Sequence, residues 1–579
     1  MKSVNSKRKR VLLPFPLAAL FAFVLLGIPA FGRNLLIQGA TLIDGTGKPR
    51  VADARILVEG EKIHSVWTGD AAPVTVPADA QVIDARGKYV IPGLIDSHVH
   101  YAGYMGEIFL SYGVTTVYDL GNPVYWQAAV KKGLNSGRIR GPRYFFCSGV
   151  GGGGMGEQDA GETNSANTRA LAAMKKPEDA KQAIAALKGK IDCIKLSENT
   201  TGEYFTAIAR EAHAAGMNII SHSLNALDSA SWGINGIEHM TGVGISAVRS
   251  SEGRAALGEM KIEAGHKNSL LYQWMDPAAF DEMIQYFIKR NVYLNPTLDF
   301  EWKGIIDRTA AFEAEDQRLL YNPLLQYVPL DERLVSLGQY HWADQRSSGD
   351  HAQFLKGYHN VQEFLRKFVK AGGRIYSGTD TASANTPGLS LHHEMQLYVD
   401  AGIPPMQALM TSTKWAAEIL RLDSEIGTVE PGKLADMVIL RADPLADIRN
   451  TKAIDEVIRG GEIADISYHS DYQFPFPQFG TPTKHLYNPP PRLTDIKPGV
   501  AVQGREARLR ILGRGFVPQS IVLFRGSPVQ TKWVSASELS AVLTPEETAL
   551  PGNFLVTVQS PKPGGGVSGG LGLIVDYGQ

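Results

Sequence analysis

The chain has 579 residues, of which 44% are hydrophobic and 20% charged, so it can bury a large core in two or three domains. Its formal net charge is −1, which excludes the strongly basic surface of a nucleic-acid-binding protein. We therefore expect no nucleic-acid partner.

Residues 1–32 have the order of a secretory signal peptide. A cluster of Lys and Arg residues precedes an apolar run from Val11 to Ile28, and small residues follow at Ala30 and Gly32. Removing this leader takes the formal net charge from −1 to −6. We expect an exported protein, periplasmic or extracellular. The alternative is an uncleaved leader that anchors the chain in a membrane, because the apolar run approaches the length of a spanning helix.

The two cysteines are Cys147 and Cys193. Both fall in predicted neighbouring strands, so one disulfide bond between them could form, but we favour two buried thiols. A core of this size does not need disulfides to hold it together.

From Gly87 onward, short β-rich runs alternate with amphipathic helical stretches, which is typical of parallel βα units. Eight strand-like runs occur, at residues 89–100, 113–121, 143–150, 191–198, 218–223, 236–240, 291–298 and 374–380. They predict an α/β fold, a (β/α)8 TIM-like barrel over residues 89–421, with its active site at the carboxyl ends of the strands. Long insertions at 243–275 and 299–350 are expected to roof the pocket.

The barrel is flanked by β-rich segments. Residues 33–88 and 422–467 read as hairpins with Gly turns and predict one small composite β-sandwich. Residues 468–493 are rich in Pro and aromatic residues and predict a linker that packs across the surface. Residues 494–579 alternate short strands with Gly and Pro turns, as in a small immunoglobulin-like β-sandwich.

The first barrel run, "YVIPGLIDSHVH", ends in two histidines, His98 and His100. Residues i and i+2 of a strand share a face, so both imidazoles point the same way and can chelate one metal ion. Taken by itself, the pair could also be two ordinary polar residues at the end of a strand. Later predicted strands end in Lys195, His222, His239 and Asp380. Six such side chains at one rim predict a metal centre.

The segments "IPGLIDSHVH", "GVTTVYDLG", "DCIKLS", "GINGIEHM", "SGTD" and "IGTVEPGKLADMVILRADPLADI" follow the order of the amidohydrolase superfamily. Residues 34–466 resemble its branch of imidazolonepropionase-like enzymes and metal-dependent Xaa-Pro or Xaa-Arg dipeptidases. The resemblance implies two divalent metal ions, most often zinc, with Lys195 carboxylated by CO₂ as their bridge. His98, His100 and Asp380 would bind the more buried ion, and His222 and His239 the more exposed one.

The resemblance also implies the reaction. We expect hydrolysis of a C–N amide bond in small peptides or N-acyl amino acids by a metal-bridging hydroxide, with Asp380 as general base and then acid. Two alternatives stay open: a cyclic-amide hydrolase of the imidazolonepropionase type, and a non-catalytic metal-binding scaffold. The expected partner is a small-molecule or short-peptide substrate, and assembly into a homo-oligomer stays open.

Substrate choice is less well specified. Met155 stands where the dipeptidase-like members usually have a loop histidine after strand three, and Leu224 where they often have His or Tyr. We expect Met155, Leu224, Tyr104 and Tyr293 to contact substrate. Arg143 and Arg254 are candidate partners for a substrate carboxylate, although structural roles are favoured for both.

The last segment contains "LTDIKPGVAVQG" and "LRILGRGFVPQSIVLFRG", which resemble an IPT/TIG domain. Such a module binds partners or packs on its own enzyme. It contains no catalytic constellation.

Overall fold

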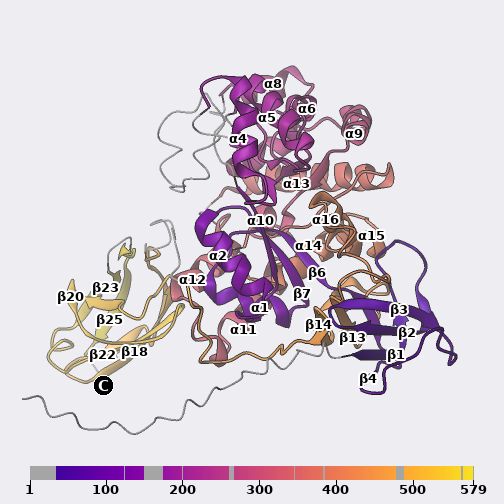
Figure 1. Ribbon diagram of the computed structural model, residues 1–579. Coiled ribbons are helices and arrows are strands. Elements are labelled where there is room, and N and C mark those ends of the chain that lie inside the picture. The colour runs from indigo at the N-terminus through magenta and orange to yellow at the C-terminus, as the bar shows by residue number, and fades with distance from the viewer. Residues whose placement is uncertain are drawn as a thin grey trace, which may run out of the picture.

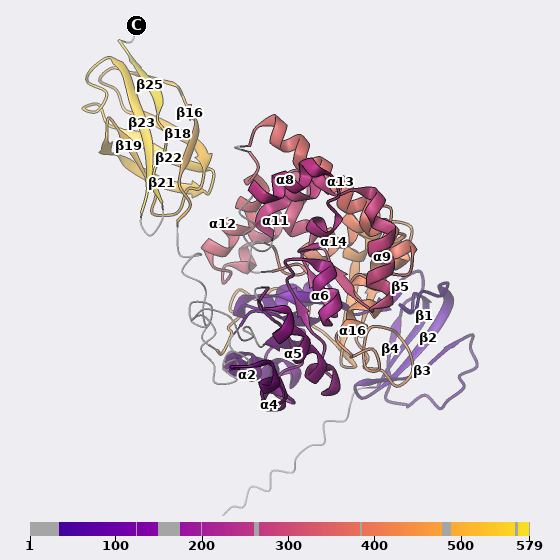
Figure 2. The same ribbon diagram turned by 90° about the horizontal axis from the view of Figure 1, so that it is seen from above.

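The computed structural model describes residues 34–122, 124–148, 174–198, 200–259, 266–344, 346–381, 385–476, 488–561 and 565–577. The expected leader and Met155 lie outside these ranges. Within them, no helix combines the length and the apolar character needed to cross a bilayer. A central α/β body lies between two β-rich regions, formed by the flanks and by the C-terminal segment (Figure 1; Figure 2).

Both flanks of the barrel contribute to one eight-stranded sheet. Its strands are β1 (Leu35–Leu42), β2 (Val51–Glu59), β3 (Lys62–Thr68), β4 (Gln81–Asp84), β5 (Tyr89–Pro92), β13 (Met437–Leu440), β14 (Ile454–Arg459) and β15 (Glu462–Ile463). The order is β15-β14-β13-β5-β1-β2-β3, with β4 also pairing β1. The first half of β1 pairs with β4 and its second half with β5, so strands from both flanks share one sheet and one core. The composite β-sandwich expected of the two flanks stays a prediction.

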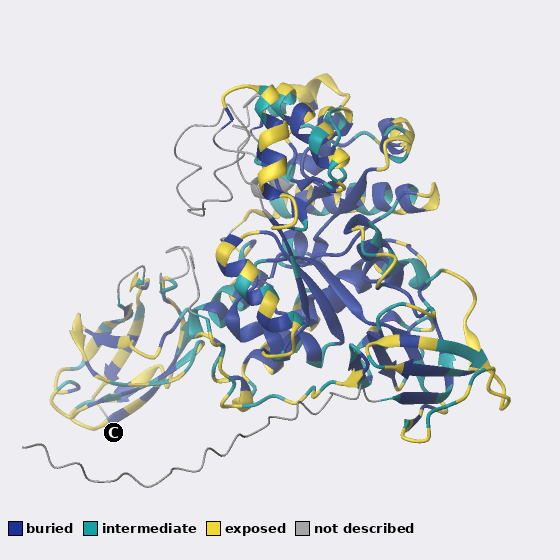
Figure 3. Ribbon diagram, viewed as in Figure 1, coloured by how far each residue is buried: buried dark blue, intermediate teal, exposed yellow. Residues whose placement is uncertain are grey.

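The strands of the central body pair in parallel. One sheet contains β6 (Leu94–Val99), β7 (Val114–Asp119), β8 (Arg143–Ser148) and β9 (Cys193–Ile194), and another contains β10 (Ile220–Ser221), β11 (Gly236–Glu238) and β12 (Tyr293–Asn295). Single parallel bridges join Ile194 to Ile219, Leu294 to Ile375 and Val99 to Thr381. The pairing therefore returns to β6, as expected of an eight-stranded parallel barrel, and these strands are buried (Figure 3).

The run "YVIPGLIDSHVH" serves two sheets. Its first four residues form β5, which pairs with β13 in the flanking sheet, and the barrel strand β6 starts only at Leu94. The change of partner occurs at Gly93, whose N–H donates to the carbonyl of Asp436 at 2.8 Å, while the N–H of Leu94 donates to that of Gly113 at 3.0 Å. The barrel was expected to start at Tyr89. Because both halves are buried, their hydropathy does not mark the boundary.

Helices cover the barrel: α1 (Gly106–Ser111), α2 (Val124–Asn135), α4 (Ala180–Leu187), α5 (Gly202–Ala214), α6 (Ala226–Trp232), α9 (Phe280–Lys289), α13 (Ser348–Lys370), α14 (Leu389–Asp400), α15 (Pro405–Thr411) and α16 (Lys414–Ile419). The spacing of apolar residues fixes the face that each helix buries. In α9, Phe280, Met283, Ile284 and Phe287 are buried, and Phe280 packs edge-on against Phe364 of α13.

The two insertions are helical. The first contains α7 (Val243–Ala247), α8 (Ser251–Glu259) and a 3-10 helix (His266–Trp274), and the second contains α10 (Leu298–Trp302), α11 (Thr309–Leu320) and α12 (Leu330–Gly338). Shorter 3-10 helices cover Gly103–Met105, Pro177–Asp179, Pro277–Ala279, Pro323–Leu325, Gln339–His341 and Ile448–Lys452.

Buried charged side chains lie inside the second insertion and at its contact with helix α14. Lys303 is fully buried, with Nζ 3.9 Å from Asp299 and 4.0 Å from Asp316, and it lies 4.6 Å from the centre of the Tyr340 ring. His393 of α14 contacts Glu315 of α11 at 3.0 Å. His393 is therefore buried between α14 and the insertion.

The C-terminal segment is β-rich. One sheet contains β16 (Arg492–Lys497), β18 (Ala507–Arg514), β21 (Gln530–Ser535) and β22 (Glu538–Leu543), and the other contains β17 (Val500–Val502), β19 (Ile521–Phe524), β20 (Ser527–Pro528), β23 (Gly552–Ser560), β24 (Gly566–Val567) and β25 (Leu571–Asp576). Alternate residues Leu509 and Ile511 of β18 enter a separate core. The assignment of this segment to the IPT/TIG class stays a prediction.

The described part of the linker packs on the barrel, as expected. The hydroxyl groups of Tyr468 and Ser111 are 2.8 Å apart, and the ring of Phe474 lies 6.1 Å from that of Tyr101. Glu107 is buried and contacts Arg140 and His469.

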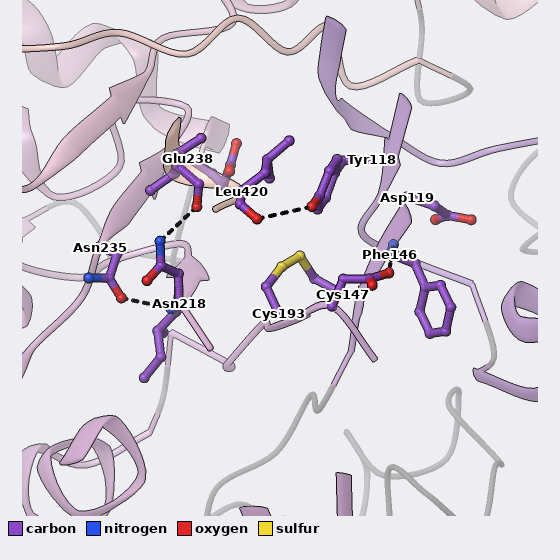
Figure 4. The surroundings of a disulfide bond; sticks show 12 residues. Tyr118, Asp119, Phe146, Cys147, Cys193, Asn218, Asn235, Glu238 and Leu420 are labelled. Carbon is purple, nitrogen blue, oxygen red and sulfur yellow. Dashed lines mark hydrogen bonds between the residues drawn. A yellow bond between two sulfur atoms is a disulfide. The ribbon is translucent and has the colours of Figure 1, made fainter. Parts of the chain in front are cut away.

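The two cysteines are joined. Cys147 of β8 and Cys193 of β9 are paired neighbours in the parallel ladder, both are buried, and they form a disulfide (Figure 4). The preference for two thiols was therefore wrong. Direct pairing of the two strands brings the side chains close enough to bond, which the sequence could not establish.

We expect denatured protein to expose no reactive thiol until reductant is added, and two afterwards. The Cys147→Ser/Cys193→Ser variant should lose about 2–4 kcal/mol of unfolding free energy, because the bridge constrains the unfolded chain. Thiol titration and urea unfolding measure the two effects. Two reactive thiols without reductant would show that the bridge is absent.

Candidate metal centre

Six side chains lie at the carboxyl ends of β6, β9, β10, β11 and the eighth parallel segment: His98, His100, Lys195, His222, His239 and Asp380. The tightest group is His98, His239 and Asp380, whose ligand atoms all lie within 4.8 Å of one another and are buried. His98 Nε2 is 3.4 Å from Asp380 Oδ1, and His239 Nε2 is 3.9 Å from Asp380 Oδ2. This geometry suits a metal-binding triad.

His100 and His222 lie beside the triad and are more exposed. His100 Nε2 is 3.0 Å from Asp380 Oδ1, and the ring of His222 is 5.0 Å from that of His239. Their side chains are 33% and 21% exposed. The triad combines one histidine from each expected ligand set, so the division of the ligands between two ions stays a prediction.

Three of the imidazoles have an acceptor at Nδ1. Nδ1 of His98 is 2.6 Å from Glu238, Nδ1 of His222 is 3.2 Å from Glu198, and Nδ1 of His239 is 2.7 Å from the hydroxyl of Thr297. An acceptor there places the proton on Nδ1 and leaves Nε2 as the donor atom for a metal.

Glu238 is the most connected of these acceptors. It is fully buried, and it accepts hydrogen bonds from Asn295 Nδ2 and the Tyr376 hydroxyl, each at 2.7 Å, besides its contact with His98. Burial raises the pKa of Glu238 to about 7, against the hydrogen bond from Tyr376, which lowers it. Its oxygens fix the orientation of the His98 ring.

Charge and burial set the protonation of the cluster. Burial, followed by the charge of Lys195, lowers the pKa of His98 well below its ordinary value. Burial also lowers the pKa of Lys195, although Glu238 and Asp380 oppose this. Burial alone would raise the pKa of Asp380, but the nearby histidines, His98 first, hold it well below its usual range.

The backbone around the cluster is constrained. His239, Thr297 and Asp380 have φ values of 56°, 46° and 54°, in the left-handed region that side chains other than Gly rarely adopt. Such strain persists where the surrounding structure enforces it, and it is concentrated at functional sites. A side chain at Gly121 would collide with the His100 ring, and one at Gly378 with His98.

The donor set fits a divalent metal. His98 Nε2 and Asp380 Oδ1 are buried, and neither has a hydrogen-bond partner among the described residues. Neutral imidazoles and an ionised carboxylate are ordinary ligands for zinc and related ions. A bound cation would offset the cost of burying these groups.

The candidate substrate contacts are spread out. Leu224 follows β10 and is 39% exposed. Tyr104 is buried, and its hydroxyl is 3.5 Å from Glu332. Tyr293 is the first residue of β12, at the end opposite to the metal cluster, and it donates to Glu418 at 3.2 Å. This placement does not support the expected substrate contact for Tyr293, because its side chain supports the amino end of the strand.

The two candidate cations have other partners. Arg143 starts β8 at the amino end of the barrel and forms a buried ion pair with Asp436 at 2.7 Å. Arg254 lies on α8, exposed, and donates to the carbonyl of Arg249. Both have the structural roles that the sequence favoured.

Sequence reasoning missed three supporting residues, Glu198, Glu238 and Thr297. Glu238 directly precedes His239 in "GIEHM", and a carboxylate inside an apolar strand signals a buried partner. Glu198 and Thr297 lie just beyond strands β9 and β12 and carry no spacing signal of their own.

Parallel strands that return to the first strand, with histidines and an aspartate at their carboxyl ends, are typical of a TIM-barrel protein with a metal site at its rim. Residues 89–464 match the model of the Amidohydrolase family. The chain belongs to the amidohydrolase family.

Curated relatives match mostly over short stretches. An imidazolonepropionase of Streptomyces griseus is 37% identical over 67 residues, which cover 12% of this chain and 16% of that protein. An N-acyl-D-aspartate deacylase of Alcaligenes xylosoxydans xylosoxydans is 44% identical over 89 residues, 14% of this chain and 17% of that protein. These matches thus span about a sixth of each relative. An imidazolonepropionase of Symbiobacterium thermophilum is 23% identical over 421 residues, covering 70% of this chain and 86% of that protein.

Solved structures share the fold. A Xaa-Pro dipeptidase with bound methionine has a TM-score of 0.51 at 20% identity and covers 74% of this chain and 99% of that one. A molinate hydrolase has a TM-score of 0.53 at 20% identity, covering 75% of this chain and 95% of that one.

Replacing Glu238 should weaken metal binding. In Glu238→Gln, the side-chain NH₂ group replaces one of the two oxygens that face His98, Asn295 and Tyr376. The His98 ring then loses its fixed orientation, so affinity for the first Zn²⁺ should fall roughly 10–100-fold. Chelator competition on metal-depleted protein measures this. Glu332→Gln, which removes a buried carboxylate outside the cluster, is the matched control. Equal affinities in the two variants would contradict the role of Glu238.

Proposed function

We propose that this protein is an exported metal-dependent hydrolase that cleaves a C–N amide bond in small peptides or N-acyl amino acids. The observation that supports it most is the buried group of His98, His239 and Asp380, with Nδ1 of both histidines held by acceptors. That arrangement supplies neutral nitrogen ligands and one anionic oxygen ligand at a barrel rim.

The ligand set extends to all six side chains in this proposal. His98, His100 and Asp380 would hold one divalent ion and His222 and His239 a second, carboxylated Lys195 would be a ligand of both, and zinc is the expected metal. Bound there, the ions would polarise the substrate carbonyl and lower the pKa of water. Burial favours the neutral Lys195 amine, the form that reacts with CO₂.

Asp380 moves the proton in this proposal. Its lowered pKa keeps it ionised, so one carboxylate oxygen can accept the proton of the attacking water and then deliver it to the leaving nitrogen. Thr297 and Glu238 keep the neighbouring rings in place. The half-buried ring of Phe300, 5.8 Å from that of His239, gives the site an apolar wall.

Export is supported by two features. Residues 1–32 have the composition of a signal peptide, and the Cys147–Cys193 disulfide suits an oxidising compartment.

A second candidate is hydrolysis of a cyclic amide. The long match to the Symbiobacterium thermophilum imidazolonepropionase favours it. A substrate panel of dipeptides, N-acyl amino acids and cyclic amides separates the two. Stoichiometric metal without cleavage of any of these would reopen the substrate class, and purified protein without metal would overturn both candidates.

Asp380→Asn should lower kcat/KM about 10²–10⁴-fold, the usual contribution of a positioned acid or base. The best substrate of the panel provides the assay, and the metal content of the variant is measured in parallel. Asp400→Asn, at the exposed end of α14, serves as the control. A variant as active as wild type would contradict the proton-transfer role.

Carboxylation of Lys195 has a direct signature. Protein loaded with zinc in ¹³C-bicarbonate should show a carbamate carbon by NMR that disappears in Lys195→Arg, because a guanidinium does not form a stable carbamate. Metal content should fall in the same variant. A carbamate signal that persists in Lys195→Arg would place the modification elsewhere.

A further inference from the structure

A cavity of about 370 Å³ lies between the second insertion and the C-terminal region. One wall comes from α11, α12 and the residues around them, and the other from β16, β18 and the chain that precedes them. Figure 1 shows α12 beside the C-terminal strands. Cavities of this size between structural units are the usual places where small molecules bind. The lining includes none of the six side chains of the metal centre.

Most of the cavity wall is apolar. The insertion contributes Tyr321, 40% exposed, and the half-buried Leu334 and Leu337, while Pro489 and Pro490 line the opposite side. Burying an apolar ligand against these side chains would remove apolar surface from water on both walls.

Two arginines line the same cavity. Arg492 begins β16 and Arg514 ends β18, and they are direct partners across the antiparallel ladder. Directly opposed side chains leave the same face of a sheet about 5 Å apart, and like charges in this position are destabilising. Another arginine on β18, Arg510, instead forms an ion pair with Glu538, with bonds of 2.8 and 2.9 Å.

Only one arginine of this pair has a carboxylate partner. Arg514 contacts Asp344 of the insertion. Glu313, also in the lining, is 2.9 Å from His341. Among the described residues, no carboxylate lies within ion-pair distance of Arg492. One end of the apolar cavity thus contains a guanidinium group without an ion-pair partner among these residues.

We propose that this cavity binds a small organic carboxylate with an apolar body. Arg492 and Arg514 would hold the carboxylate, since a guanidinium matches its geometry with paired hydrogen bonds. The anion would also remove the repulsion between the two arginines. Because the apolar body would contact α12 as well as the C-terminal region, the ligand stabilises their association and couples the insertion to that region.

Calorimetric titration of the full-length purified protein with 3-phenylpropanoate, an apolar acid without a peptide bond, tests this, with the uncharged 3-phenylpropanamide as the matched ligand. Wild type should bind the acid. Arg492→Gln should bind it roughly tenfold more weakly, because one charged hydrogen-bonding partner is lost. Arg510→Gln removes an arginine from the same region outside the cavity, and it should bind like wild type. Binding at the metal centre would be the same in all three proteins.

A second variant tests the other wall. Leu337→Gln should also weaken binding of the acid, because it places a polar group against the apolar body. Thermal unfolding of each variant checks that the fold is intact. The proposal is overturned if wild type does not bind the acid, if the amide binds equally well, or if a folded Arg492→Gln or Leu337→Gln protein retains wild-type affinity.

Discussion

The carboxylate of Glu238 connects four segments of the barrel. It lies on β11 and contacts His98 of β6, Asn295 of β12 and Tyr376 of the eighth segment. The eighth segment, residues 374–381, also joins both neighbours by backbone hydrogen bonds, so the bonds of Glu238 add to those of the ladder. A buried carboxylate that loses its partners costs more free energy than each bond contributes. Glu238 therefore both links the strands that close the barrel and orients a candidate metal ligand.

The candidate ligands could be predicted because they follow from two simple rules. A strand sends alternate residues to one face, and parallel strands of a barrel end at one rim, so His98, His100, His222, His239 and Asp380 had to lie near one another. The structure brings them together. The supporting residues could not be predicted in this way, because Glu198 and Thr297 act through the three-dimensional contact of one loop with another strand's histidine.

Other expectations failed for physical reasons. The run at residues 89–100 is apolar throughout, so hydropathy does not show that Gly93 transfers the chain from one sheet to another. The disulfide depends on two strands being neighbours in register, information that is absent from either cysteine alone. Tyr293 was expected near the rim, whereas it is the first of the three residues of β12, at the amino end of the strand.

The flanking sheet has a consequence for how the molecule is made. Strand β5 pairs with β13, whose residues follow the whole barrel in the chain, so the amino-terminal strands lack their neighbour until Met437–Leu440 have been synthesised. Completion of the flanking sheet therefore follows synthesis of the whole barrel, whereas the C-terminal region has a core made of its own residues and does not depend on this pairing.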